Sequence, residues 1–288
     1  RTGCAQRPRM RLIDVRHLGR ERVIGCWEID GVLIDPGPTS SMENLIEALD
    51  GMEPRALLLT HIHLDHAGAS GNLVRRWPDL AVYVHERGAP HLADPSKLLG
   101  SAERLYGDQM ERLWGEVAPV PESNLNPLSG GEELLGFRVA YTPGHASHHV
   151  SYLHPPTGRA FVGDTAAVRI PPSDFVMPPT PPPDIDPELW EESIDRILDW
   201  QPASLGLTHF GEVDHPETHL ELVRERLREQ AQLARELPSE EFERRYRERV
   251  AELADPESGA AMLQAVPPEQ QWSGLNRYWE RARRRSGG

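Results

Sequence analysis

Three histidines and one aspartate lie within six consecutive positions of the sequence, directly after a short apolar segment. They are His61, His63, Asp65 and His66, and the apolar segment covers residues 56–59. Neutral imidazoles and carboxylates are the ligands that zinc, iron and manganese accept. Holding them at this density is costly unless a cation neutralises and orders them. The run therefore predicts a metal site rather than a solvated histidine-rich turn.

The spacing within this run suits the end of a strand followed by a turn. His61 and His63 are two positions apart, so in an extended chain both side chains leave the same face. Asp65 and His66 would then turn toward a neighbouring point. One loop could in this way serve two adjacent metals.

Three further candidate ligands occur downstream, each near a glycine at the end of a strand-like apolar segment. They are His145, Asp164 and His209. Glycine marks turns, so we expect each of them where a strand ends. In a sheet-based protein, side chains at strand ends converge on one edge, where binding sites usually form.

With these residues in this order, the chain resembles the metallo-β-lactamase superfamily, whose members carry an early aspartate, an HxHxDH loop and then a later His, Asp and His. The resemblance spans residues 10–211 and rests on five motifs in the same order. It looks closest to the glyoxalase II-like branch, particularly its uncharacterised prokaryotic hydrolases. It implies an α/β fold, an αββα sandwich of two packed sheets covered by helices.

The resemblance also implies how the candidate ligands divide between two divalent metal ions. One ion would be held by His61, His63 and His145, the other by Asp65, His66 and His209, with Asp164 bridging them. Zinc is the expected metal, with iron or manganese as alternatives. Asp65 would also orient a water or receive its proton, which makes it the expected catalytic residue.

Three more residues are expected next to the ligands. Asp35 matches the early aspartate of the family and would orient a ligand histidine, although locally it reads equally well as a turn residue before Pro-Gly. His148 and His149 closely follow His145. One of them would support a ligand or contact substrate, and the alternative is a hydrogen-bonded structural role.

The reaction expected at such a site is hydrolysis of an ester, thioester or lactone of a small molecule. Two cations would lower the pKa of a bridging water toward about 7 and polarise the carbonyl group that it attacks. Lactonase, β-lactamase and phosphodiesterase activities stay open, because the same ligands serve all of them. The rival from another class is a persulfide dioxygenase-like enzyme, with one iron on His61, His145 and Asp164. A noncatalytic metal-stabilised binding protein is the third reading.

The elements that must position these residues alternate between strands and helices. Residues 12–35 read as an antiparallel sheet that turns at Asp30-Gly31, a pair typical of two-residue hairpins. A helix is expected over residues 42–49, a strand over 81–85, and a helix over 187–200 with Asp186 as its N-cap.

Domain organisation follows from the same pattern. Residues 1–9 are interpreted as an N-terminal extension or expression remnant, residues 10–211 as the metallo-β-lactamase-fold domain, and residues 212–288 as a C-terminal extension of two or three helices. We expect this extension either to cap the site or to form a homodimer interface. The proline-rich residues 170–187 would either border the metal site or serve as a rigid connector.

Composition restricts the class of partner. The net charge is −14 over 288 residues, and this disfavours nucleic acid, whose phosphates are bound by clustered Lys and Arg. No apolar run approaches the roughly 20 residues that span a bilayer, so no membrane partner is expected. Two cysteines do not make a disulfide framework, and a reducing cytoplasm is the expected location.

Overall fold

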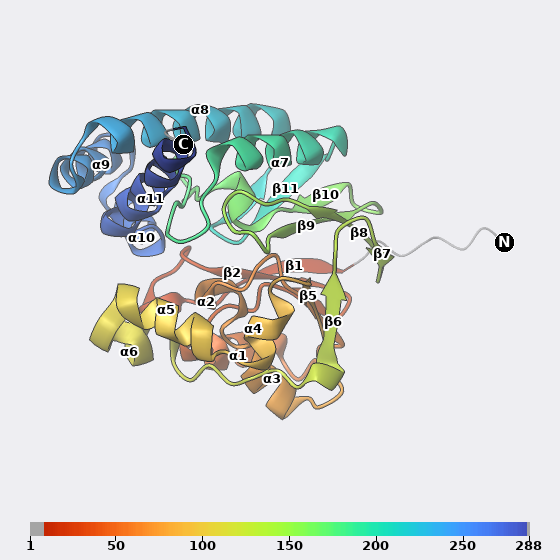
Figure 1. Ribbon diagram of the computed structural model, residues 1–288. Helices are drawn as coiled ribbons and strands as arrows, with labels where there is room; N and C mark the ends of the chain where they lie inside the picture. The colour runs from red at the N-terminus through yellow and green to blue at the C-terminus, as the bar shows by residue number, and fades with distance from the viewer. Residues whose placement is uncertain (1–8, 287–288) are drawn as a thin grey trace.

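Two six-stranded sheets face each other in the computed structural model, which describes residues 9–286 (Figure 1). Their strand orders are β1-β2-β3-β4-β5-β6 and β12-β11-β10-β9-β8-β7. Helices cover the outer face of each sheet, as the predicted αββα sandwich requires. Of the N-terminal extension expected over residues 1–9, all but Arg9 lies outside the described residues.

The first sheet begins as an antiparallel meander and continues as parallel strands. Its strands are β1 (Met10–Asp14), β2 (Gly25–Ile29), β3 (Val32–Ile34), β4 (Ala56–Leu58), β5 (Ala81–His85) and β6 (Leu125–Leu128). Strands β3 to β6 are parallel, so each connection must cross over, and helices fill these crossovers. Asp30 and Gly31 both have positive φ and form the predicted turn between β2 and β3.

The crossover helices lie on the outer face of the first sheet. They are α1 (Met42–Leu49), α2 (Leu64–Ala67), α3 (Ser70–Arg76), α4 (Ala89–Ala93), α5 (Ser96–Tyr106) and α6 (Met110–Trp114), and the short 3-10 turns are η1 (His17–Gly19), η2 (Thr39–Ser41), η3 (Gly107–Gln109) and η4 (Glu122–Asn124). Helices α4 to α6 form the long connection between β5 and β6. Tyr106 and Trp114 pack there beside Leu64, so this connection covers the short helix α2.

The second sheet is mainly antiparallel, with one parallel pair. Its strands are β7 (Glu133–Leu134), β8 (Phe137–Tyr141), β9 (Val150–His154), β10 (Arg159–Phe161), β11 (Ser204–Leu207) and β12 (Gly211–Val213). Helix α7 (Pro187–Asp199) makes the crossover between the parallel strands β10 and β11. The Asp186 side chain accepts a hydrogen bond from Leu189 N, which confirms the predicted N-cap.

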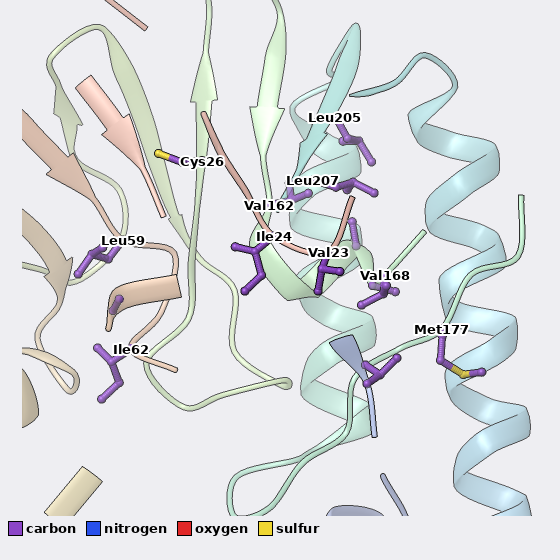
Figure 2. Packing of buried hydrophobic residues seen from close by; sticks show 14 of the residues in the cluster. Val23, Ile24, Cys26, Leu59, Ile62, Val162, Val168, Met177, Leu205 and Leu207 are labelled. Carbon is purple, nitrogen blue, oxygen red and sulfur yellow. The ribbon is translucent and has the colours of Figure 1, made fainter. Parts of the chain in front are cut away.

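Alternating side chains of the strands fill two separate layers of the core. In β4, Leu58 packs between the two sheets, whereas Leu57 packs toward the helices. Burying one such side chain stabilises the fold by about 1.5–3 kcal/mol. Figure 2 shows the larger cluster, which extends from Ile62 beside the histidine-rich loop to Val168 and Met177. The loops that carry the candidate ligands are therefore anchored at both ends in packed core.

Four helices follow the second sheet, one more than the upper number expected from the sequence. They are α8 (Pro216–Glu236), α9 (Ser239–Leu253), α10 (Pro256–Ala265) and α11 (Pro268–Ser286). Helix α8 packs on α7, and α11 packs on α8 and α9. Among residues 9–286, no helix is long and apolar enough to cross a membrane. The domain boundary expected after residue 211 stays a prediction.

A proline-rich segment, residues 177–183, contacts helix α11, and we call it the proline strap. At Gly274 the helix backbone touches the strap, since a Cβ atom at this position would lie 2.1 Å from the carbonyl oxygen of Thr180. No larger residue fits this contact without a shift of the strap or of the helix.

Gly274→Ala is expected to lower the free energy of unfolding by about 1–3 kcal/mol, because overpacking has a cost of this size. Gly100, inside helix α5, is the matched control, since no heavy atom lies within 4 Å of a Cβ built there. Gly100→Ala is expected to stabilise the protein by about 0.5–1 kcal/mol through helix propensity. Denaturant unfolding measures the free energy of unfolding of both variants. If both substitutions raised it, the close contact between Gly274 and the strap would be contradicted.

Candidate metal centre

Seven side chains from four turns meet at one edge of the two sheets. They are His61, His63, Asp65 and His66 after β4, His145 between β8 and β9, Asp164 in the turn η5 (Gly163–Ala166) after β10, and His209 between β11 and β12. All are buried except His63 and Asp65, which are half-buried. The structure therefore brings together all seven of the ligands predicted from the sequence. Their role as ligands stays a prediction.

The first of two groups consists of His61, His63, His145 and Asp164, one ligand atom from each lying within 4.8 Å of the others. His63 Nδ1 lies 2.9 Å from Nε2 of both His61 and His145. Asp164 Oδ2 lies 3.3 Å from His145 Nε2. Four donor atoms thus surround one point, as a metal ion requires.

The second group consists of Asp65, His66 and His209. His209 Nε2 lies 3.3 Å from both Asp65 Oδ2 and His66 Nε2. Asp164 also reaches this group, because its Oδ1 lies 3.2 Å from His66 Nε2. Asp164 therefore presents one carboxylate oxygen to each group, the arrangement expected of a bridging ligand.

Backbone carbonyls fix the orientation of two of these imidazoles. His145 Nδ1 lies 2.9 Å from the carbonyl oxygen of Pro179, and His209 Nδ1 lies 2.5 Å from that of Val23. A carbonyl can only accept, so in each ring Nδ1 carries a proton and Nε2 is the nitrogen that faces the centre and can bind a metal once it is deprotonated. Sequence reasoning missed both partners, because main-chain carbonyls leave no mark in the residue types.

The carboxylate of Asp35, fully buried, orients two more of the rings. It accepts hydrogen bonds from Thr60 N at 2.8 Å, Thr60 Oγ1 at 2.7 Å, Thr208 Oγ1 at 2.9 Å and His66 Nδ1 at 2.7 Å. Thr60 Oγ1 in turn lies 3.1 Å from His61 Nδ1 and accepts its proton. The sequence predicted that Asp35 orients a histidine, but not the two threonines. Each threonine directly precedes a candidate ligand, and this repeated Thr-His pair could have revealed them.

The chemistry of the donor set fits a cation. His61 and His145 both turn the lone pair of Nε2 inward, and the single proton on His63 Nδ1 can satisfy only one of them. Asp164 Oδ1 is buried without a hydrogen-bond partner, since it approaches His66 Nε2 without the alignment of a hydrogen bond. Buried acceptors without donors are unfavourable, and a metal ion removes this cost.

In the metal-free protein, protons supply part of the positive charge that a cation would bring to the centre. Burial favours the neutral form of Asp164, but His66 and His145 outweigh it and hold the pKa of this carboxyl well below its usual range. Burial likewise lowers the pKa of His66, whereas Asp164, Asp35 and Asp65 together raise it well above 6.5. A positive charge is thus favoured on His66 in the metal-free protein, between the carboxylates that would hold a cation.

His148 and His149 lie beside the first group. The His149 ring stacks on His61 at 5.1 Å and its Nδ1 lies 2.9 Å from Thr142 Oγ1, while its Nε2 is buried without a partner. A Cβ at position 163 would lie 2.7 Å from this Nε2, so Gly163 makes room for the ring. His148 instead borders the cavity described next. Their supporting or substrate-contacting roles stay predictions.

A cavity of about 310 Å³ opens at the first group and reaches His63, Asp65 and Asp164. Its walls come from three parts of the chain: Arg87, His91, Lys97 and Tyr106 near α4 and α5, the proline strap, and Val266, Gln270 and Gln271 around α10 and α11. In Figure 1, both sets of helices lie at the left end of the molecule, α5 and α6 in its lower half and α9, α10 and α11 in its upper half. The C-terminal helices and the strap therefore border the site, and the homodimer stays a prediction.

A second cavity, of about 250 Å³, reaches the second group at Asp65 and His209. Tyr106 and Gln270 line both cavities and are joined by a hydrogen bond of 3.3 Å from the tyrosine hydroxyl to Gln270 Oε1. This bond between α5 and α11 lies where the two cavities adjoin, and Asp65 also lines both of them.

Comparison with known proteins gives matches over most of the chain. A family model described as the metallo-beta-lactamase superfamily matches residues 28–200, more than half of the sequence. The metallo-beta-lactamase fold-containing protein ST1585 of Sulfurisphaera tokodaii is 32% identical over 193 residues, which cover 65% of this chain and 70% of that protein. A crystal structure of ST1585 from Sulfolobus tokodaii has a TM-score of 0.71 at 25% identity and covers 92% of this chain and 97% of that one.

An enzyme is also among the relatives. The hydroxyacylglutathione hydrolase of Legionella pneumophila (strain Lens) is 30% identical over 140 residues, which cover 48% of this chain and 44% of the enzyme. The chain thus spans less than half the length of this relative. Together the matches confirm the resemblance inferred from the sequence, including its relation to glyoxalase II.

Asp35→Asn is expected to weaken metal binding by about 10–100-fold, because an amide cannot accept all four hydrogen bonds and His66 loses its fixed orientation. Glu28→Gln is the matched control. Glu28 is also a buried carboxylate, but it serves Arg11 and the backbone of Gly31. Chelator competition measures the affinity, and equal losses in both variants would show that Asp35 acts through stability alone.

Metal binding at neutral pH is expected to release about one to two protons per chain, so the affinity rises with pH. The raised pKa of His66 and that of His209 favour protonated rings in the metal-free protein, and a cation must displace those protons. The pKa of His209 is raised despite its burial, because Asp65 and Asp164 lie beside it. Calorimetric titration in two buffers of different ionisation heat counts the protons, and a count of zero would contradict this account.

Proposed function

Because the chain belongs to the metallo-β-lactamase superfamily, we propose that it is a hydrolase with a binuclear metal centre that cleaves an ester, thioester or lactone of a small molecule. Members of the superfamily are metallo-hydrolases and bind metal ions. The relation to hydroxyacylglutathione hydrolases, at about 30% identity, supports a thioester as the first substrate class to test.

The observation that carries the proposal is the division of the donor atoms into two groups that share Asp164. A single metal would need only one of these groups. Six of the seven side chains offer an atom to one group each, and only Asp164 presents an oxygen to both. Imidazole and carboxylate donors without any cysteine suit zinc, and they also accept iron or manganese.

When bound, divalent cations would lower the pKa of a water toward about 7 and polarise a substrate carbonyl. We assign the proton of that water to Asp65, and this is supported by its being half-buried and lining both cavities. Burial favours its neutral form, but His66 and His209 outweigh this and lower the pKa of Asp65. Asp65 is therefore ionised at neutral pH and can accept a hydrogen bond.

The size of the cavity supports a small substrate. A volume of about 310 Å³ holds a small molecule rather than a polymer segment. Arg87 and Lys97 lie on its wall, although the chain as a whole has a net charge of −14. Asp184 lies on the same wall, so Arg87 and Lys97 are single cationic groups that could pair with an anionic part of the substrate, not a positive patch.

Elemental analysis of protein purified without added metal is expected to find about two equivalents per chain, together with turnover of a thioester or ester. The same preparation is tested on a thioester, a lactone and a phosphodiester. One equivalent of iron, oxygen consumption with a thiol persulfide and no hydrolysis would instead support the dioxygenase.

The His66→Asn variant is expected to bind about one metal equivalent fewer and to have a kcat/KM lower by more than about 100-fold. Replacing even a residue that only orients a ligand typically lowers metal affinity or activity by about 10–100-fold. His154→Asn is the matched control. His154 is also buried, but it lies in β9 and bonds Thr157 rather than the centre. Unchanged metal content in the His66 variant would contradict the proposed ligand set.

A further inference from the structure

The proline strap connects the C-terminal helices to one candidate metal ligand. The strap carbonyl of Pro179 accepts the hydrogen bond from His145 Nδ1 at 2.9 Å. The next residue, Thr180, is fully buried and lies against both α8 and α11. The two residues share one peptide group, so any force on Thr180 N also orients the oxygen of Pro179.

Two glutamines hold Thr180 from opposite sides. On α8, Gln230 Nε2 donates to Thr180 Oγ1 at 3.0 Å and to the carbonyl of Pro178 at 3.3 Å. On α11, Gln271 Oε1 accepts from Thr180 N and, at 3.1 Å, from Thr180 Oγ1. Gln271 Nε2 is itself held by the carbonyl of Pro267 at 3.0 Å. The hydroxyl of Thr180 thus accepts from one helix and donates to the other.

Burial makes this arrangement specific. Thr180, Gln230 and Gln271 are exposed by 0%, 5% and 1% of their surfaces. Buried amides and hydroxyls are costly unless paired, and these three satisfy one another in only one arrangement. The close approach of Gly274 to the carbonyl of Thr180 presses the same strap residue against α11.

We propose that Thr180, Gln230 and Gln271 form a clamp that positions His145 for the first metal. This rests on the part of the proposed function that makes His145 a ligand. The peptide group between Pro179 and Thr180 is planar, and it is held at one end by Gln271 and bonded at the other to the ring of His145. The clamp thereby fixes both the tautomer and the direction of this ring.

The clamp acts on one metal group only. His209 and His66, in the second group, are oriented by the carbonyl of Val23, which precedes β2, and by Asp35, which follows β3, and not by residues of the C-terminal helices. Loosening the strap is therefore expected to weaken the first metal and to leave the second in place.

Thr180→Val and Thr180→Ser form the test pair. Valine keeps the shape but removes the hydroxyl, and serine keeps the hydroxyl but removes a methyl group. Thr180 is chosen because it does not itself line the cavity at the first group, whereas Pro179 and Gln271 do. In Thr180→Val, zinc titration with chelator competition is expected to show one of two equivalents weakened by about 10–100-fold. In Thr180→Ser, both equivalents should bind as in the native protein.

Tyr246→Phe controls for general destabilisation of the helical layer. Its hydroxyl donates a buried hydrogen bond of 3.3 Å to the carbonyl of Val266, and this bond involves neither Thr180 nor the two glutamines. This variant is expected to bind both metals normally. Weakening of both equivalents in Thr180→Val, or equal weakening in Tyr246→Phe, would overturn the clamp and leave only a structural role.

A second readout needs no metal. Nitrogen-15 NMR of the metal-free protein reports the exchange of the His145 Nδ1 proton, which the clamp protects by holding its acceptor in place. Thr180→Val is expected to accelerate this exchange at least about tenfold, and Thr180→Ser is not. Native rates in Thr180→Val would overturn the clamp. If the native protein binds no metal, the proposed function fails, while the exchange rates still decide whether the clamp positions His145.

Discussion

Four hydrogen bonds to the carboxylate of Asp35 join the two sheets at the edge where the candidate ligands meet. Thr60 follows a strand of the first sheet and Thr208 a strand of the second, and both donate to the same carboxylate as His66 does. A buried carboxylate is tolerated only when such donors surround it. One contact between the sheets and the orientation of the His66 ring therefore depend on the same group. Packing of the core and geometry of the centre cannot change independently.

The candidate ligands could be predicted from the sequence because each lies in a local pattern, a polar residue next to a turn at the end of an apolar segment. The start of helix α7 was also predictable from a local pattern, since Asp186 and Pro187 are typical of an N-cap and of the first helical residue. The partners of His145 and His209 were not predictable, because they are main-chain carbonyls that tertiary packing brings near. The count of C-terminal helices was also wrong, because apolar periodicity continues through their short connections.

The residues that match the family model include most of the candidate ligands but not the whole wall of the larger cavity. The matched region, residues 28–200, contains six of the seven candidate ligands, and the seventh, His209, lies just beyond it. Helices α10 and α11 lie farther along the chain, yet they supply part of the wall of the larger cavity. The matched region therefore contains most of the candidate centre, and part of the cavity wall lies outside it. Under the proposed function, selection among substrates would depend in part on that wall.

The hydrogen bonds between the strap and Gln271 also set an order of events during synthesis on the ribosome. His145 and the strap emerge long before α11 does, and chains generally begin to fold in the order in which they emerge. The sheets can pair and bury Asp35 at that stage, but the strap still lacks its acceptor on α11. The first metal group therefore reaches its final geometry only when α11 docks. A nascent chain whose α11 has not yet docked would hold an incomplete first group, so the geometry of these candidate ligands depends on docking of α11.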